Sequence, residues 1–99
     1  MLQVYKTTIR VKCPNGHWNA VPTEDWEQAE PEIIEKPDCA MGNETHHHLE
    51  LSDCSCRQCG EKISASIDVW EYPVGAVADR DQSDNVNAAD AASAVTIVP

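Results

Sequence analysis

Two cysteines separated by two residues and followed by a glycine form the segment Cys56-x-x-Cys59-Gly60. Two thiolates at this spacing can reach the same metal ion, and glycine permits the positive φ that such a turn requires. A structural zinc ion takes four ligands, drawn mainly from thiolate and imidazole. The rest of the chain must therefore bring two further ligands to Cys56 and Cys59.

The composition indicates why the fold needs such a site. The chain has 99 residues, of which 41% are hydrophobic and 5% aromatic, with no Phe, so it can form at most one modest domain with a thin core. Small domains of this kind usually depend on a metal, on disulfides or on a partner chain. The cysteine count of five is odd, and the N-terminal segment lacks the apolar run of a secretory signal. We therefore expect a cytoplasmic protein with a metal site and no membrane span.

Alternation of apolar and polar residues predicts a mainly β fold. Ile63, Ala65, Ile67 and Val69 alternate with polar residues and give the clearest strand pattern in the chain. Similar patterns predict strands over residues 5–11, 18–21 and 45–51. The Pro14-Asn15-Gly16 sequence favours a turn, so we expect the first two of these strands to form a tight hairpin.

The remaining segments predict little regular structure. Thr23 can cap a short helix of about two turns that Pro31 ends, and residues 32–43 are typical of an irregular loop. Residues 76–94 are mostly Ala, Asp, Asn and Ser and predict a disordered tail, although residues 88–94 have a weak helical pattern. The terminal residues 94–98 are apolar enough to add a strand. We therefore expect a domain over residues 1–75 and a flexible tail over residues 76–99.

The hairpin tip supplies candidates for the two missing ligands. Cys56-x-x-Cys59-Gly60 resembles a knuckle of the zinc ribbons, the rubredoxin-like class, and Cys13-Pro14-Asn15-Gly16-His17-Trp18 resembles their other knuckle with its second Cys missing. That Cys would stand at Gly16, and His17 follows one residue later with a longer side chain. The resemblance covers residues 5–73 and implies a zinc-ribbon-like antiparallel sheet around one structural Zn²⁺. Its ligands would be Cys13, His17, Cys56 and Cys59, with Cys54 as the rival ligand.

Other Cys and His residues allow further sites. A Cys39–Cys54 disulfide is disfavoured in a reducing cytosol, so both are expected to be non-ligand thiols. Within His46-His47-His48, consecutive strand residues point to opposite faces, so only His46 and His48 can act together. With Glu44 on that face, they would form a loose set of two imidazoles and one carboxylate. The alternative is an ordinary polar strand face.

Charge and motifs limit the function. The net charge is −10, and residues 21–53 carry ten acidic residues against Lys36, so that they repel a phosphate backbone and favour a solvated acidic face. No nucleophile elbow, phosphate loop or H-E-x-x-H helix is present, so we do not expect an enzyme. Three tryptophans favour protein contacts. The preferred hypothesis is a zinc-binding protein-interaction or regulatory module.

Two alternatives stay open at this point. The basic residues near the two knuckles would support a nucleic-acid-binding ribbon if they converge. These residues are Lys6, Arg10, Lys12, Arg57 and Lys62. Conversely, the acidic residues of positions 24–53 would support a DNA mimic of the type used by phage or bacterial antagonists.

Overall fold

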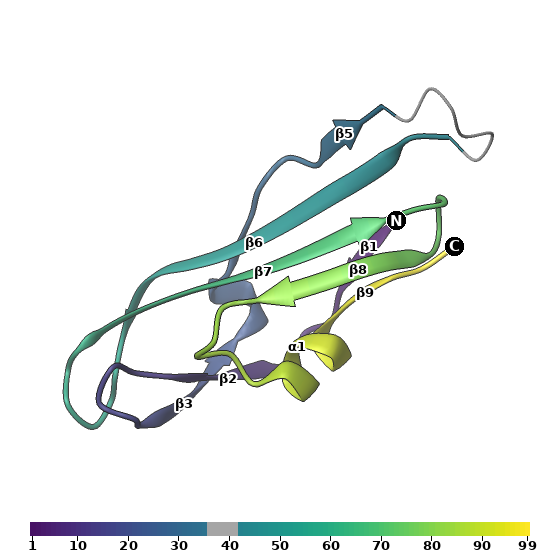
Figure 1. Cartoon of the computed structure of the whole chain (residues 1–99). Coiled ribbons are helices and arrows are strands. Elements are labelled where there is room, and N and C mark those ends of the chain that lie inside the picture. The colour runs from purple at the N-terminus through teal and green to yellow at the C-terminus, as the bar shows by residue number, and fades with distance from the viewer. Residues whose placement is uncertain (36–41) are drawn as a thin grey trace.

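Short strands dominate the chain in a computed structural model that describes residues 1–35 and 42–99 (Figure 1). The strands are β1 Leu2–Val4, β2 Thr8–Lys12, β3 Trp18–Pro22, β4 Glu27–Gln28, β5 Glu32–Ile34, β6 Glu44–Ser55, β7 Lys62–Glu71, β8 Val77–Gln82 and β9 Val95–Ile97. A 3₁₀ turn, η1 Thr23–Asp25, and one helix, α1 Ala88–Ala94, complete the described elements. All strand pairs are antiparallel, which confirms the expected mainly β class with one short helix.

The long hairpin of β6 and β7 is the largest unit of the fold. The pairing runs from Thr45 opposite Glu71 to Ser55 opposite Lys62, with a register shift between Leu51 and Cys54. β8 pairs with the free edge of β7, while β4 and β5 pair with β6 on its other side. The two strands predicted over residues 45–51 and 63–69 are therefore confirmed and are longer than the patterns indicated.

β2 and β3 form the predicted tight hairpin. Its register ends with Lys12 opposite Trp18, which leaves residues 13–17 as the connecting turn. Ile9, Val11 and Val21 are buried, because they occupy the same face of the two strands. This face packs into one hydrophobic cluster with the inward residues of β6 and β7.

The three tryptophans differ in burial. Trp26 is 6% exposed and belongs to the core, and Trp70 is half-buried on β7. Trp18 is 48% exposed and lies beside the turn of the first hairpin. Of the three, Trp18 alone has the exposure expected of a contact residue.

The helix predicted after Thr23 is wrong beyond its first turn. The Thr23 hydroxyl donates to the Tyr5 carbonyl at 2.8 Å and accepts from the Thr7 amide at 3.2 Å, so it fastens the turn to the chain before β2 instead of capping a helix. The chain then enters β4, whose pairing with β6 requires extended backbone. Residues 32–34, which were expected to lie in a loop, form β5 and also pair with β6.

The disorder expected for residues 76–94 is also wrong, whereas the helical pattern noted over residues 88–94 is confirmed as α1. β8 pairs with β7. Asn87 caps the start of α1, because its side chain accepts a hydrogen bond from the Asp90 amide at 3.0 Å. The helix and β9 bury Ala91, Ala94, Val95 and Ile97. β9 pairs with β1, so the apolar end of the chain adds a strand to the N-terminal segment. Buried residues from 1–75 and from 76–99 thus belong to one hydrophobic cluster.

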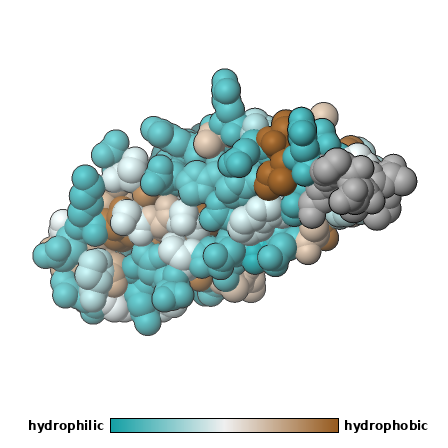
Figure 2. Space-filling view, turned by 45° about the horizontal axis from the view of Figure 1, so that its top comes forward, coloured by the Kyte–Doolittle hydropathy of each residue, from teal (hydrophilic) through white to brown (hydrophobic). Residues whose placement is uncertain are grey.

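The molecule is elongated, with principal extents of 51 × 20 × 19 Å. Figure 1 shows the two chain ends near each other at one end of the long hairpin, and the β2–β3 turn beside the β6–β7 turn at the other. On the face seen in Figure 2, hydrophilic surface predominates and the hydrophobic areas are small and separate. In the part of the chain that the structure describes, no helix is long and apolar enough to cross a membrane.

Candidate metal centre

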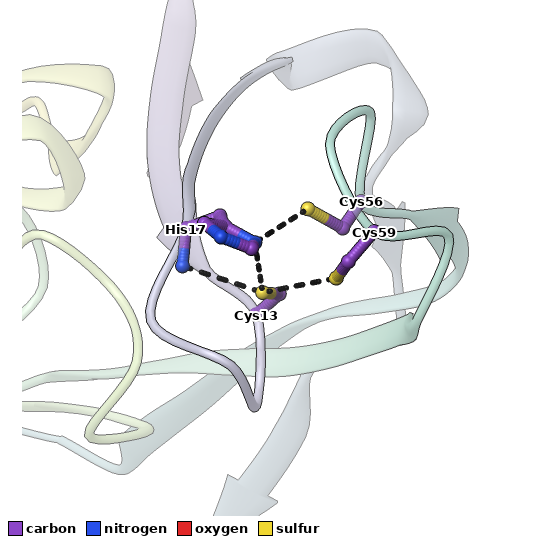
Figure 3. Close-up of side chains that lie close together, drawn as sticks. All are labelled: Cys13, His17, Cys56 and Cys59. Atoms are coloured by element: carbon purple, nitrogen blue, oxygen red, sulfur yellow. Dashed lines mark hydrogen bonds between the residues drawn. The ribbon is translucent and has the colours of Figure 1, made fainter.

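The two hairpin turns bring the four predicted ligands together. Cys13 and His17 come from the turn between β2 and β3, and Cys56 and Cys59 come from the turn after β6 (Figure 3). One ligand atom from each side chain lies within 4.8 Å of all the others. In Figure 3 the three sulfurs and the imidazole ring point toward a common centre. The cluster therefore fits a four-ligand metal site.

Three of the six separations between ligand atoms match those of a tetrahedron around zinc. Zinc bonds of about 2.3 Å to sulfur and about 2.0 Å to nitrogen place neighbouring ligands about 3.8 Å apart for two sulfurs and about 3.5 Å apart for sulfur and nitrogen. Sγ of Cys13 lies 3.7 Å from Sγ of Cys59 and 3.5 Å from Nδ1 of His17. Sγ of Cys56 lies 3.7 Å from the same Nδ1. Three edges of the cluster thus have the lengths that a bound zinc would require.

In both turns a glycine with positive φ donates its amide back to the carbonyl of the first cysteine, three residues away in the first turn and four in the second. In the first turn the Gly16 amide donates to the Cys13 carbonyl at 2.9 Å, and Gly16 has φ +88°. In the second, the Gly60 amide donates to the Cys56 carbonyl at 2.9 Å, and Gly60 has φ +75°. Residues with a Cβ adopt this backbone conformation only at an energetic cost, which explains the glycine in each turn. The turns curl back on themselves and direct both side chains to one point.

Nitrogen donors surround the sulfur atoms. The backbone amides of His17 and Gln58 donate to Sγ of Cys13 and Sγ of Cys56 at 3.3 and 3.4 Å. The Asn15 amide group donates to Sγ of Cys59, and that of Asn19 to Sγ of Cys56, each at 3.4 Å. Donors to sulfur stabilise the thiolate, which is the form that binds metal.

Asn19 also connects the two turns. Its side chain is buried, donates to the His17 carbonyl at 3.2 Å and accepts from the Arg57 amide at 3.0 Å. One side chain therefore contacts the backbone of both hairpin tips and a sulfur of the site. Sequence reasoning missed this residue. The available signal was an Asn two positions before Val21, on the inward face of β3, where a polar group needs buried partners.

The ionisation of the group follows from these contacts. The hydrogen bond from Asn19 is the main cause that lowers the pKa of Cys56 to about 5, and the bond from Asn15 lowers the pKa of Cys59. Burial raises the pKa of Cys13, and hydrogen bonds to Cys59 and Cys56 raise the pKa of His17. Contacts within the protein thus favour the thiolate form of Cys56 and Cys59.

The structure describes one of the two cysteines that were not predicted as ligands, Cys54, and not the other, Cys39. Cys54, the rival ligand, is a half-buried free thiol within β6, opposite Ile63, and is not part of the cluster. It packs against the hydrophobic core instead. Cys39 lies outside the described residues. Cys13, Cys56 and Cys59 are also free thiols, so no disulfide competes with metal at these positions.

The histidine run forms a second group of ligand atoms. His46 and His48 share a face of β6, as predicted, and the carboxylate that joins them is Asp68 of β7 rather than Glu44. Sequence alternation identified the two histidines, but the register with β7 selects the carboxylate.

Comparisons with known proteins add no relative. A scan against protein-family models finds no match, and searches of curated proteins and of solved structures find no similar protein. The likeness to a zinc ribbon therefore depends on two hairpin turns and the four metal-ligating side chains that they bring together.

Proposed function

We propose that the chain is a small zinc-binding module whose metal has a structural role. The observation that carries this proposal is the convergence of Cys13, His17, Cys56 and Cys59, with three of their separations at the edge lengths of a zinc tetrahedron. Four protein ligands close the coordination sphere, whereas catalytic zinc keeps a position for water. The proposed role is accordingly non-enzymatic.

The metal would join the two hairpin turns, which Asn19 also connects. Zinc binding to small structural sites contributes about 10–16 kcal/mol at neutral pH, while whole domains are stable by only about 5–15 kcal/mol. Because 46 positions separate Cys13 from Cys59, this bond network would close a long stretch of chain. Folding and metal binding are therefore expected to be coupled.

The surface beside the metal centre supports a protein partner over nucleic acid. Arg10, which the nucleic-acid hypothesis requires, forms a bidentate ion pair with Asp90, at 2.7 and 3.1 Å. Lys12 lies 5.3 Å from the ring centre of Trp18 in a cation–π contact. Two of the basic residues are thus engaged within the chain, and the exposed Trp18 gives an aromatic contact point. We propose that the module acts by binding another protein and that it does so in the cytoplasm.

Native mass spectrometry and far-UV circular dichroism, with and without a chelator, test the proposal. We expect one zinc in the cluster and loss of the folded signal when metal is removed. Cys56→Ser removes a ligand, and Cys54→Ser changes a cysteine two positions away that lies outside the cluster. Co²⁺ substitution separates them further, because the thiolate-to-cobalt absorption of the cluster should weaken in the first variant and persist in the second.

Two results would contradict the structural zinc. A chain that keeps its fold after complete metal removal would show that the hairpins do not depend on the ion. Equal loss of cobalt absorption in the Cys54 and Cys56 variants would show that the ligand set is different.

A further inference from the structure

A second group of ligand atoms lies on the outer face of the long hairpin. Nε2 of His46 is 2.8 Å and Nδ1 of His48 is 2.7 Å from the same atom, Oδ1 of Asp68. The three ligand atoms lie within 4.8 Å of one another. Two imidazoles and one carboxylate converge on one point without belonging to the cysteine cluster.

Regular strand geometry holds these three residues in place. His48 is directly opposite Asp68 in the β6–β7 register. His46 comes two residues before His48 in β6 and lies on the same outer face. His47 points the other way, is buried and contacts Oε1 of Glu71 at 2.9 Å. The group therefore lies on the central pair of strands of the five-stranded sheet, where the backbone is fixed by pairing on both sides.

The ring of His46 has the surroundings of a metal-binding histidine. It stacks on Trp70, with 4.7 Å between ring centres and 12° between planes, which fixes the ring orientation. Its second nitrogen, Nδ1, lies 3.7 Å from Oε2 of Glu32 on β5. Histidine ligands usually direct their other N–H to a carboxylate, which sets the tautomer and strengthens the ligand.

The charge around the group favours a cation. Asp81 on β8 is directly opposite Asp68, and Asp79 is directly opposite Trp70, so both share the outer face. Like charges opposite each other in a sheet destabilise it, and a bound cation would offset that repulsion. The side chains of His46, His48 and Asp68 are 22%, 33% and 20% exposed, so solvent reaches part of the group.

We propose that His46, His48 and Asp68 form a second, open site for a divalent first-row transition-metal ion. Two imidazoles and one carboxylate suit zinc, cobalt, nickel or iron, while calcium and magnesium prefer all-oxygen sets. Three protein ligands leave positions for water or a small anion, so this ion exchanges, unlike one in a closed four-ligand site. On binding, each coordinating nitrogen is unprotonated and the ring N–H lies on the other nitrogen, which at His46 faces Glu32.

The two sites share no ligand and lie far apart. Eight positions separate His48 from Cys56, a span of about 25 Å along an extended strand. An ion at the second site therefore does not contact the first site, and the ligand chemistry distinguishes the two. Cobalt bound by thiolates absorbs strongly, whereas cobalt bound by two histidines and a carboxylate absorbs weakly.

Calorimetric titration with Zn²⁺ of protein already carrying one zinc equivalent tests the second site, with stoichiometry checked by native mass spectrometry. The wild-type chain should bind one further equivalent. His46→Gln combined with His48→Gln should weaken that step at least tenfold, as should Asp68→Asn. Glu50→Gln is the matched control, because Glu50 is an exposed residue two positions after His48 on the same face of β6. Loss of the Glu50 charge should change the affinity for the second zinc less than about threefold, since an exposed charge is screened.

The proposal is overturned if wild-type protein takes up no further zinc, or if the double histidine variant binds it as tightly as wild type. Should that variant fail to fold, as judged by loss of the thiolate–cobalt absorption, NMR of the wild-type histidine rings decides the matter. Added zinc should shift the ring signals of His46 and His48 and leave that of buried His47 nearly unchanged. Equal shifts at all three, or none, would also overturn it.

Discussion

At the residue scale, the four ligands and their support differ in how readily the sequence discloses them. Cys56 and Cys59 follow from spacing, and Cys13 and His17 follow from their place at a hairpin tip. Asn19 could not be assigned, because the sequence of β3 does not say which sulfur and which amide face its side chain. Asp68 was missed for the same reason, since its partners are set by strand register.

Asn19→Ala should weaken zinc binding 10- to 100-fold, the usual effect of removing a group that supports a metal ligand. The change removes the acceptor of the part-buried Arg57 amide and the bonds that Asn19 donates to the His17 carbonyl and to Cys56, which should lower the free energy of unfolding of the zinc-bound protein by about 1–3 kcal/mol. Competition with a zinc indicator and urea denaturation measure the two effects.

Asn15→Ala is the matched control for that change. Asn15 also donates to a sulfur, but it is exposed and water can replace its hydrogen bond to Cys59. Its effect should be clearly smaller. An equal or larger loss in the Asn15 variant would show that burial of Asn19 has no special importance to the site.

At the element scale, alternation predicted β2, β3, β6 and β7, because one side of each is buried. It did not predict β1, β4, β5 or β8, none of which has a fully buried residue. It failed for the segment after Thr23, where capping residues and a Pro favour a helix but pairing with β6 imposes extended backbone. The metal-bearing turns lie between these cases. The sequence predicted both turns from their Gly residues and other turn-forming residues. The positive φ values of these glycines explain why glycine is needed at these positions.

Gly60→Ala should destabilise the zinc-bound protein by about 1–2 kcal/mol, the cost of a left-handed conformation for an L-residue. The cost is purely conformational, because a Cβ at Gly60 would meet no atom within 4 Å. Gly60→Asn should cost less, since Asn adopts this conformation more readily. Urea denaturation of the zinc-bound variants measures both, and an Asn variant less stable than the Ala variant would contradict this explanation.

At the scale of the whole molecule, the C-terminal segment shows the limit of composition as a guide. Residues 76–94 are polar on average, yet Ala91 and Ala94 fall on the buried side of α1 and Asp90 pairs with Arg10 of β2. The short apolar end then closes the fold by pairing β9 with β1. Small apolar residues can complete a thin core when a helix cap and an ion pair fix their position.

Val95→Asp tests whether this segment is part of the folded unit. Val95 is fully buried and lies where α1 meets β9, so a carboxylate there would lose water without gaining a partner. We expect the free energy of unfolding to fall by at least about 3 kcal/mol. Ala89→Asp is the control, because Ala89 is exposed in the first turn of α1, where a negative charge is tolerated and the change should stay within about 0.5 kcal/mol. If the tail were disordered, neither substitution would change the free energy of unfolding. The observed packing instead makes Val95 as sensitive as a residue of the central strands. Urea denaturation of both variants distinguishes these outcomes.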